Sequence, residues 1–84
     1  MFLAKIFISL KPTVNDPQGL TVLAGLKDLS FKSVESVRVG KYIEVKVNDR
    51  HVRQAMQSID DMCQQLLANP VIEDYRFELE DVEE

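Results

Sequence analysis

The chain has 84 residues and contains no tryptophan, one cysteine, one histidine and only three glycines. A lone cysteine, Cys63, cannot form a disulfide within the chain, which fits a reducing compartment. One cysteine and one histidine do not supply the spacing of a metal site. No apolar run approaches the roughly 20 residues of a membrane span, and Lys5 interrupts the first ten residues, unlike a signal peptide. We therefore expect a soluble cytoplasmic protein without a metal site or membrane segment.

Positive charge is also scarce. The formal net charge is −4, which argues against nucleic acid as a partner because such binding depends on neutralising phosphates. Five acidic residues fall within 78–84. We expect an acidic, solvated C-terminal tail at about 80–84, with docking to a basic partner as the alternative.

The length predicts a single domain over residues 1–84 with a small core. Apolar residues alternate with polar ones over 4–10, which predicts a strand that ends at Pro12. Asp16-Pro17 has the residues of a helix start, and the apolar spacing that follows predicts a helix over roughly 17–30. Two alternating segments, 36–39 and 42–47, meet at Gly40-Lys41 and predict a hairpin with these residues in its turn.

A second helix is predicted after Asp49, which can cap it. Its apolar residues recur at spacings of three, four and seven; they are Val52, Ala55, Met56, Ile59, Met62, Cys63, Leu66 and Leu67. Asn69-Pro70 is expected to end this helix, with Asn69 in the left-handed position. A last strand is predicted where Tyr75, Phe77 and Leu79 alternate with polar residues.

These elements predict a βαββαβ domain: a four-stranded antiparallel sheet with both helices on one face, the ferredoxin-like pattern. This fold serves many functions, so it does not identify one. The open face of the sheet is expected to carry Lys5, Phe7, Ser9, Arg38, Tyr42, Glu44 and Lys46. Aromatic residues among spaced charges favour a protein interface, and two free sheet edges need cover. We therefore expect at least a dimer, most simply with two-fold symmetry.

Catalytic groups are hard to place. Cys63 lies within the apolar stripe of the second helix, so we interpret it as a core residue. His51 lies about 18 Å away along the same helix and cannot act with it. The carboxylates are interpreted as solvated. Two anion sites are conceivable, at the Gly40-Lys41 turn and at the helix start Asp16–Gly19, but a turn and a helix cap explain these residues better.

Three segments together resemble the PurS family over nearly the whole chain. They are KIFISLKPTVNDPQG, VRVGKYIEV and CQQLLANPVIEDYRFELE. The resemblance implies a non-catalytic subunit of phosphoribosylformylglycinamidine synthase, a ligase of purine biosynthesis that takes ammonia from glutamine. It implies a dimer or tetramer that bridges a PurQ-type glutaminase and a PurL-type synthetase. It also implies that this chain binds no cofactor and that the synthetase uses the ATP and Mg²⁺.

The resemblance further implies candidate residues for the partner interface. Asp16, Pro17 and Gly19 match a DPxG motif of the family, Gly40 and Lys41 match a GK turn, and Asn69, Pro70 and Glu73 match NPVIE; Arg38 precedes the turn. Pro17, Gly40 and Pro70 also have a purely structural explanation. Lys41, expected at a hairpin tip that the fold does not need, is the best functional candidate, and our hypothesis is that it docks on the synthetase.

Three alternatives remain at this point. A dimeric small-molecule-sensing domain of ferredoxin-like fold is the main one, although the loop 12–16 lacks the glycines that such sites tend to use. An RNA-binding module would place Phe7 and Tyr42 on the open sheet face, but the closely spaced aromatic pattern of such modules is absent. The third is a structural dimer with an unrelated partner.

Overall fold

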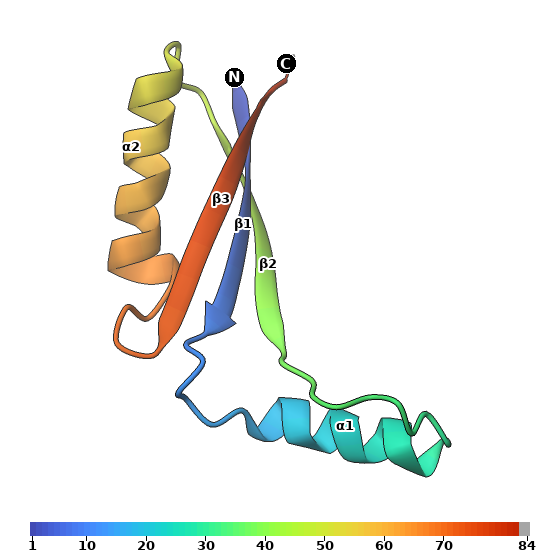
Figure 1. Cartoon of the computed structure of the whole chain (residues 1–84). Coiled ribbons are helices and arrows are strands. Elements are labelled where there is room, and N and C mark those ends of the chain that lie inside the picture. Colours follow the sequence, from blue (N-terminus) through green and yellow to red (C-terminus); the bar gives the residue numbers. More distant parts are fainter. Residues whose placement is uncertain (83–84) are drawn as a thin grey trace.

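The computed structural model describes residues 1–82 (Figure 1). In chain order the elements are β1 (Phe2–Leu10), α1 (Pro17–Asp28), β2 (Gly40–Val47), α2 (Val52–Met62), a π-helical turn (Cys63–Leu67) that prolongs α2, and β3 (Glu73–Asp81). The two ends of the described chain lie side by side at one end of the sheet, and α1 lies beyond the other end.

The sheet is antiparallel, with the order β2-β1-β3. In the centre Ile6 lies opposite Ile43 on β2 and Phe77 on β3. The period-two pattern of the first and last predicted strands is thus confirmed, because alternate residues point to opposite faces. Ala4, Ile6 and Ile8 point toward α2 and are buried.

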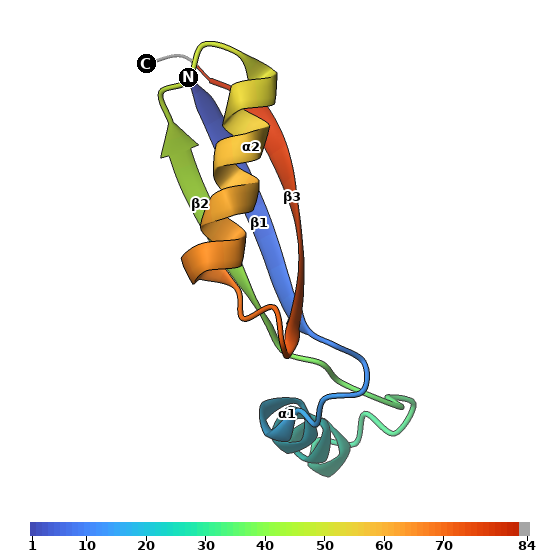
Figure 2. The same cartoon turned by 90° about the vertical axis from the view of Figure 1, so that its left-hand side faces the viewer.

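One helix covers this sheet face. Figure 2 shows α2 in front of the sheet, running along the strands. Ile59 and Cys63 are fully buried there against the β1 residues. Cys63 is a core residue, as predicted. Its burial raises the pKa of the thiol, and the Asp60 carboxylate adds to the rise, so the reactive thiolate is disfavoured.

The expectation of a four-stranded sheet is wrong: within residues 1–82 the sheet has three strands. Residues 36–39 alternate as a strand should, yet they run as an irregular extended segment. The predicted hairpin would have paired this segment with β2. Instead the Val39 amide donates to the Asp16 carboxylate and the Arg38 side chain donates to backbone carbonyls between β1 and α1. The segment therefore has the alternation of a strand but no neighbouring strand bonded to it.

The predicted hairpin at Gly40-Lys41 is also wrong. Gly40 is the first residue of β2 and lies opposite Ser9 of β1. Its φ is not positive. The glycine is needed for space instead, because a Cβ atom there would lie 2.5 Å from the Ile8 carbonyl oxygen.

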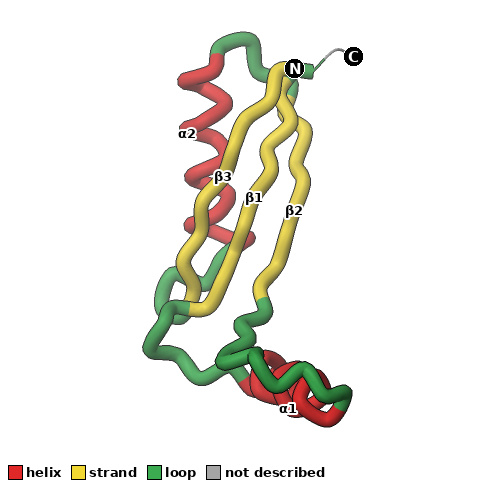
Figure 3. The backbone as a smooth tube through the Cα atoms, turned by 45° about the vertical axis from the view of Figure 1, so that its right-hand side comes forward, coloured by secondary structure: helices red, strands yellow, loops and turns green. Residues whose placement is uncertain are grey.

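The first helix does not cover the sheet. The start of α1 at Pro17 after the Asp16 cap is confirmed, but the helix points away from the strands, with the segment after it running back alongside (Figures 1 and 3). The molecule is consequently elongated, with extents of 50 × 28 × 15 Å. The prediction of two helices on one face therefore fails.

A serine ends α1. The Phe31 amide donates to the Leu26 carbonyl and the Ser30 amide donates to the Lys27 carbonyl, with Ser30 at φ 77°. This is the Schellman arrangement, in which glycine is the usual residue at the left-handed position. Ser30 therefore holds a conformation that costs a residue with a Cβ atom.

The limits of the second helix also differ from expectation. The helix begins after His51 rather than at an Asp49 cap. Ala55, Ile59 and Cys63 of its stripe are buried, but Leu66 is 83% exposed. The π turn holds an extra residue, which rotates Leu66 out of the stripe. Asn69 is not left-handed and shapes the following loop instead.

Candidate partner interface

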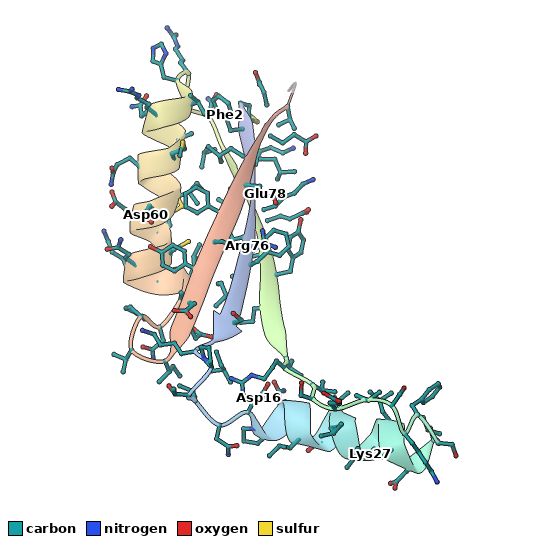
Figure 4. All side chains as sticks on the ribbon, in the orientation of Figure 1. Phe2, Asp16, Lys27, Asp60, Arg76 and Glu78 are labelled. Carbon is teal, nitrogen blue, oxygen red and sulfur yellow. The ribbon has the colours of Figure 1, made fainter. Side chains whose placement is uncertain are left out.

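The nine interface candidates gather at the end of the molecule where α1 joins the sheet. They form two clusters. The elbow contains Asp16, Pro17, Gly19 and Arg38, and the strand-end cluster contains Gly40, Lys41, Asn69, Pro70 and Glu73. Figure 4 labels Asp16 at the junction of α1 and the strands. Sequence analysis selected these residues from separate motifs, and the fold brings each set together.

Asp16 ties the elbow together. One carboxylate oxygen accepts from the Gly19 amide at 3.0 Å, as a helix N-cap does. The other accepts from the Val39 amide at 2.7 Å. The bonds from Val39 and then Gly19 lower the pKa of this carboxyl against the opposing effect of desolvation. The Asp16 side chain therefore joins the chain entering α1 to the chain leaving it.

Gly19 fits because it has no side chain. A Cβ atom at this position would collide with the Val37 carbonyl oxygen and lie 2.7 Å from the Asp16 carboxylate. Pro17 occupies the first helical position, where its missing amide proton is not needed. The DPxG motif thus lets the returning segment pass directly over the start of α1.

Arg38 is in the elbow and not on the open sheet face, where we expected it. Its guanidinium donates to the Lys11 carbonyl at 3.0 Å and to the Val14 carbonyl at 2.9 Å. These bonds link the returning segment to the loop after β1. Together with Asp16, Arg38 gives the elbow four bonds that set the direction of α1.

The strand-end cluster is built around Glu73. Its carboxylate lies 3.4 Å from the Lys41 ammonium and accepts from the Asn69 amide at 2.7 Å. Lys41 is therefore not at a hairpin tip; it lies near the start of β2. Its side chain is 54% exposed whereas that of Glu73 is 13% exposed, so the lysine ammonium stays accessible from outside the molecule.

Asn69 and Pro70 belong to the loop between the π turn and β3. The Asn69 side-chain oxygen accepts from the Val71 amide at 3.1 Å, and the Ile72 carbonyl accepts from the Lys11 amide at 2.9 Å. The loop is thereby held against the chain leaving β1. Val71, at its tip, is 79% exposed.

The open sheet face carries paired charges around an aromatic centre. The Phe7 and Tyr42 rings lie 5.1 Å apart, and the Arg76 guanidinium lies 4.1 Å from the centre of the Phe7 ring. Lys5 pairs with Glu80 at 3.2 Å. Figure 4 shows Arg76 and Glu78 on the side of the sheet away from α2. Sequence analysis missed Arg76, although its alternation with Tyr75 placed it on this face.

Hydrogen bonds and charges shift two pKa values on this face. Glu80 raises the pKa of Lys5 by a hydrogen bond and by its charge. Tyr42 donates to Glu44 at 2.8 Å, and this bond raises the pKa of the phenol. Both shifts favour the protonated forms, in which Lys5 carries the charge that pairs with Glu80 and Tyr42 keeps its donor proton.

A hollow of about 330 Å³ opens where this face meets the strand-end cluster. Its lining includes Phe7, Ser9, Gly40, Lys41, Asp74 and Arg76. Gly40 helps to form the hollow because it places no side chain beside Ser9. The hollow therefore combines an aromatic wall with groups of both charges.

The described part of the chain has neither a membrane-spanning helix nor a cluster of metal-ligating side chains. Within residues 1–82, no helix is long and apolar enough to cross a membrane. In the same range, no three His, Cys, Asp or Glu side chains converge as metal ligands.

The fold and these clusters define an α+β domain with one covered sheet face, one open face and a helix held away from the core, an arrangement that suits association with other chains. The PurS family model, described as phosphoribosylformylglycinamidine (FGAM) synthase, matches residues 3–81. The chain therefore belongs to the PurS family.

Individual relatives agree with this membership. The chain is 43% identical to phosphoribosylformylglycinamidine synthase subunit PurS of Bacillus subtilis over 82 residues, which are 98% of this chain and 96% of that protein. The crystal structure of PurS from Methanocaldococcus jannaschii superimposes with a TM-score of 0.87 at 35% identity, covering 99% of this chain and all of that one. A chain of PurLQS from Thermotoga maritima superimposes with a TM-score of 0.84 at 26% identity, covering 94% and 98%.

Proposed function

We propose that this protein is the assembly subunit of a cytoplasmic FGAM synthase, which uses ATP and glutamine to amidate formylglycinamide ribonucleotide. The observation that carries the proposal is the PurS match over residues 3–81, with relatives named as subunits of that synthase. PurS of Thermotoga maritima is part of a PurLQS structure. By analogy, the partners here are a PurL-type synthetase, a PurQ-type glutaminase and further copies of this chain.

In this role the chain supplies no active site. Its thiol is buried, and we assign ATP, Mg²⁺ and the glutaminase cysteine to the partners. The contribution of this chain is to hold the partner subunits in position. Ammonia at neutral pH is mostly protonated and then not nucleophilic, so its source and acceptor must be held together. Fixing two sites in register replaces a bimolecular encounter with a local transfer.

The two clusters are the proposed contact surface. The elbow holds α1 in one direction, and the strand-end cluster presents the Lys41 ammonium beside it. A rigid surface loses little conformational freedom on binding, which favours a bridging role. The acidic residues at 78–84 offer a second contact; Glu80 and Asp81 belong to β3, and 83–84 lie outside the described residues.

The test is glutamine-dependent amidation of formylglycinamide ribonucleotide by the matching synthetase and glutaminase, with and without this chain. Activity should require the chain when glutamine is the donor and should persist without it when ammonia is supplied. Equal glutamine-dependent rates with and without the chain would overturn the proposal.

Lys41 supplies a sharper test of the surface. Lys41→Ala should weaken binding to the synthetase and lower glutamine-dependent turnover, because it removes an exposed charge at the proposed contact. The exposed ion pair with Glu73 stabilises the fold by at most about 1 kcal/mol, so folding should survive. Lys46→Ala, an exposed lysine at the other end of β2, is the control. Equal binding and turnover for both variants would refute a docking role for Lys41.

The hollow favours one second candidate, a small-molecule sensor. Its volume lies at the lower end of the range for ligand pockets, and its lining has cationic and anionic groups. The hollow does not lie at the loop after the first strand, where such domains tend to use glycine-rich turns. Calorimetric titration with amino acids and nucleotides distinguishes the candidates: saturable heat that Arg76→Ala abolishes would favour the sensor.

A further inference from the structure

The hollow on the open sheet face results from two small residues that lie side by side. Ser9 of β1 lies opposite Gly40 of β2 and Asp74 of β3, so these residues form one row across the sheet. The neighbouring row on the same face holds three large side chains, Tyr42, Phe7 and Arg76. The step between the two rows forms the hollow of about 330 Å³.

The floor of the hollow is fixed by the backbone. A Cβ atom on Gly40 would lie 2.5 Å from the Ile8 carbonyl oxygen, so a larger residue does not fit where β2 approaches β1. The strands beneath are packed from the other side, because Ile8 is buried in the core and the Tyr75 hydroxyl donates to Asp60 of α2 at 2.7 Å. The hollow is therefore present before any ligand arrives, as ligand pockets usually are.

Arg76 is held at the wall of the hollow in a position to bind a carboxylate. Its guanidinium lies 4.1 Å from the centre of the Phe7 ring. Within residues 1–82 its one hydrogen bond goes to Glu78 at 3.3 Å, on the side of the sheet away from α2 (Figure 4). The two side chains of this pair are 66% and 64% exposed, so the pair is weak and a second carboxylate can compete with Glu78. The planar fork of N–H donors suits such a group.

The opposite charge lies beside Arg76. Asp74 is two residues earlier on the same face of β3, so the two Cα atoms are about 7 Å apart. None of the ion pairs among residues 1–82 includes Asp74, so its carboxylate is available to an ammonium group. Lys41 also lines the hollow, but its ammonium is paired with Glu73 at 3.4 Å. The hollow thus offers one cation and one anion to a ligand that carries both charges close together.

We propose that the hollow binds a free α-amino acid with an uncharged side chain, whose carboxylate pairs with Arg76 and whose ammonium pairs with Asp74. The Ser9 hydroxyl lies between them in the register and can bond either group. The volume suits a small ligand. A nucleotide base lacks a stacking surface here, because Arg76 covers the Phe7 ring and the Tyr42 ring lies tilted at 5.1 Å beside it.

Such a ligand belongs to the small-molecule candidate named above, and the assembly role stands whether or not the hollow is filled. The first measurement is an NMR titration of the ¹⁵N-labelled chain with leucine. The amides of Ser9, Gly40, Asp74 and Arg76 should shift and saturate in the millimolar range, as expected for a ligand of about ten non-hydrogen atoms. No saturable shift, or shifts confined to other residues, would overturn the proposal.

Two analogues of leucine test the need for both charges. Isoamylamine lacks the carboxylate and 4-methylpentanoate lacks the ammonium, and each should bind at least tenfold more weakly than leucine. Adenosine monophosphate is the nucleotide probe and should leave the four amides unchanged. An analogue that binds as well as leucine, or a nucleotide that binds more tightly, would refute the ligand class.

Three variants assign the charges to residues. Asp74→Asn and Arg76→Gln keep the size of each side chain and should each weaken leucine binding at least tenfold. Glu78→Gln removes the carboxylate that competes for Arg76 and should tighten binding. The side chains are exposed, so all three variants should keep the wild-type amide spectrum away from the hollow. Unchanged affinity in either Asp74→Asn or Arg76→Gln, or weaker binding in Glu78→Gln, would contradict the assignment.

Discussion

The Asp16 carboxylate accepts hydrogen bonds from two amides, that of Gly19 in the first turn of α1 at 3.0 Å and that of Val39 in the segment after α1 at 2.7 Å. Val39 lies 23 residues further along the chain. A helix cap is ordinarily a local feature, but this one also fixes where the chain returns. The Asp16 side chain thus sets the direction of α1 together with Arg38.

Asp16→Asn should make the stability of the protein less dependent on pH. The folded state lowers the pKa of Asp16, so its stabilising contribution is present above the unfolded value near 3.8 and is lost as pH falls through the folded value. The variant should unfold at lower urea concentration at pH 7, and the difference from wild type should shrink below about pH 4. A difference that stays constant from pH 7 to pH 3 would contradict the role of the charged carboxylate.

Gly19→Ala should destabilise the protein by about 1–3 kcal/mol, because its Cβ would collide with the Val37 carbonyl. Gly25→Ala is the matched control on the same helix. No atom lies within 4 Å of a Cβ there, so this change should stabilise the helix by up to about 1 kcal/mol. Urea unfolding of both variants measures the contrast. Equal shifts of the same sign would show that the returning segment does not press on Gly19.

Ser30→Gly should stabilise the protein by about 1 kcal/mol. Ser30 has φ 77°, a conformation that glycine adopts without the clash of a Cβ atom. The midpoint of thermal unfolding should rise by several degrees. Ser33→Gly, in the same connection but without positive φ, serves as the control and should show no such rise.

Cys63 should resist thiol reagents in the native protein. The side chain is buried and its pKa is raised, so both access and thiolate formation are unfavourable. Labelling with an alkylating reagent should be at least a hundredfold slower in buffer than in denaturing urea. Fast native labelling would mean that α2 separates readily from the sheet.

Local sequence patterns determined several elements of this protein and its family. The alternation around Ile6 and around Phe77 predicted β1 and β3 because one face of each strand is buried by α2. Asp16-Pro17 predicted the start of α1 because the cap depends on adjacent residues alone. The motifs of the PurS resemblance predicted the family, which the match over residues 3–81 confirmed. The roles of the interface candidates remain predictions.

The errors concern relations between segments. Residues 36–39 have a strand pattern, but the Val39 amide bonds to the Asp16 carboxylate and not to the edge of β2. Leu66 fits the stripe of α2, but a π turn alters the spacing that the pattern assumes. Arg38 alternates like a sheet residue, yet it binds carbonyls of a loop 24 and 27 residues earlier.

The sequence by itself determined the family, the Asp16 cap of α1 and the alternation of β1 and β3, because each depends on neighbours along the chain or on a regular period. Only the tertiary structure decided that α1 leaves the sheet, that Lys41 pairs with Glu73 and that nine separate candidates gather at one end of the molecule. Those features depend on contacts between residues far apart in the chain, such as the bond from Val39 to Asp16, and a one-dimensional pattern contains no distance between such residues.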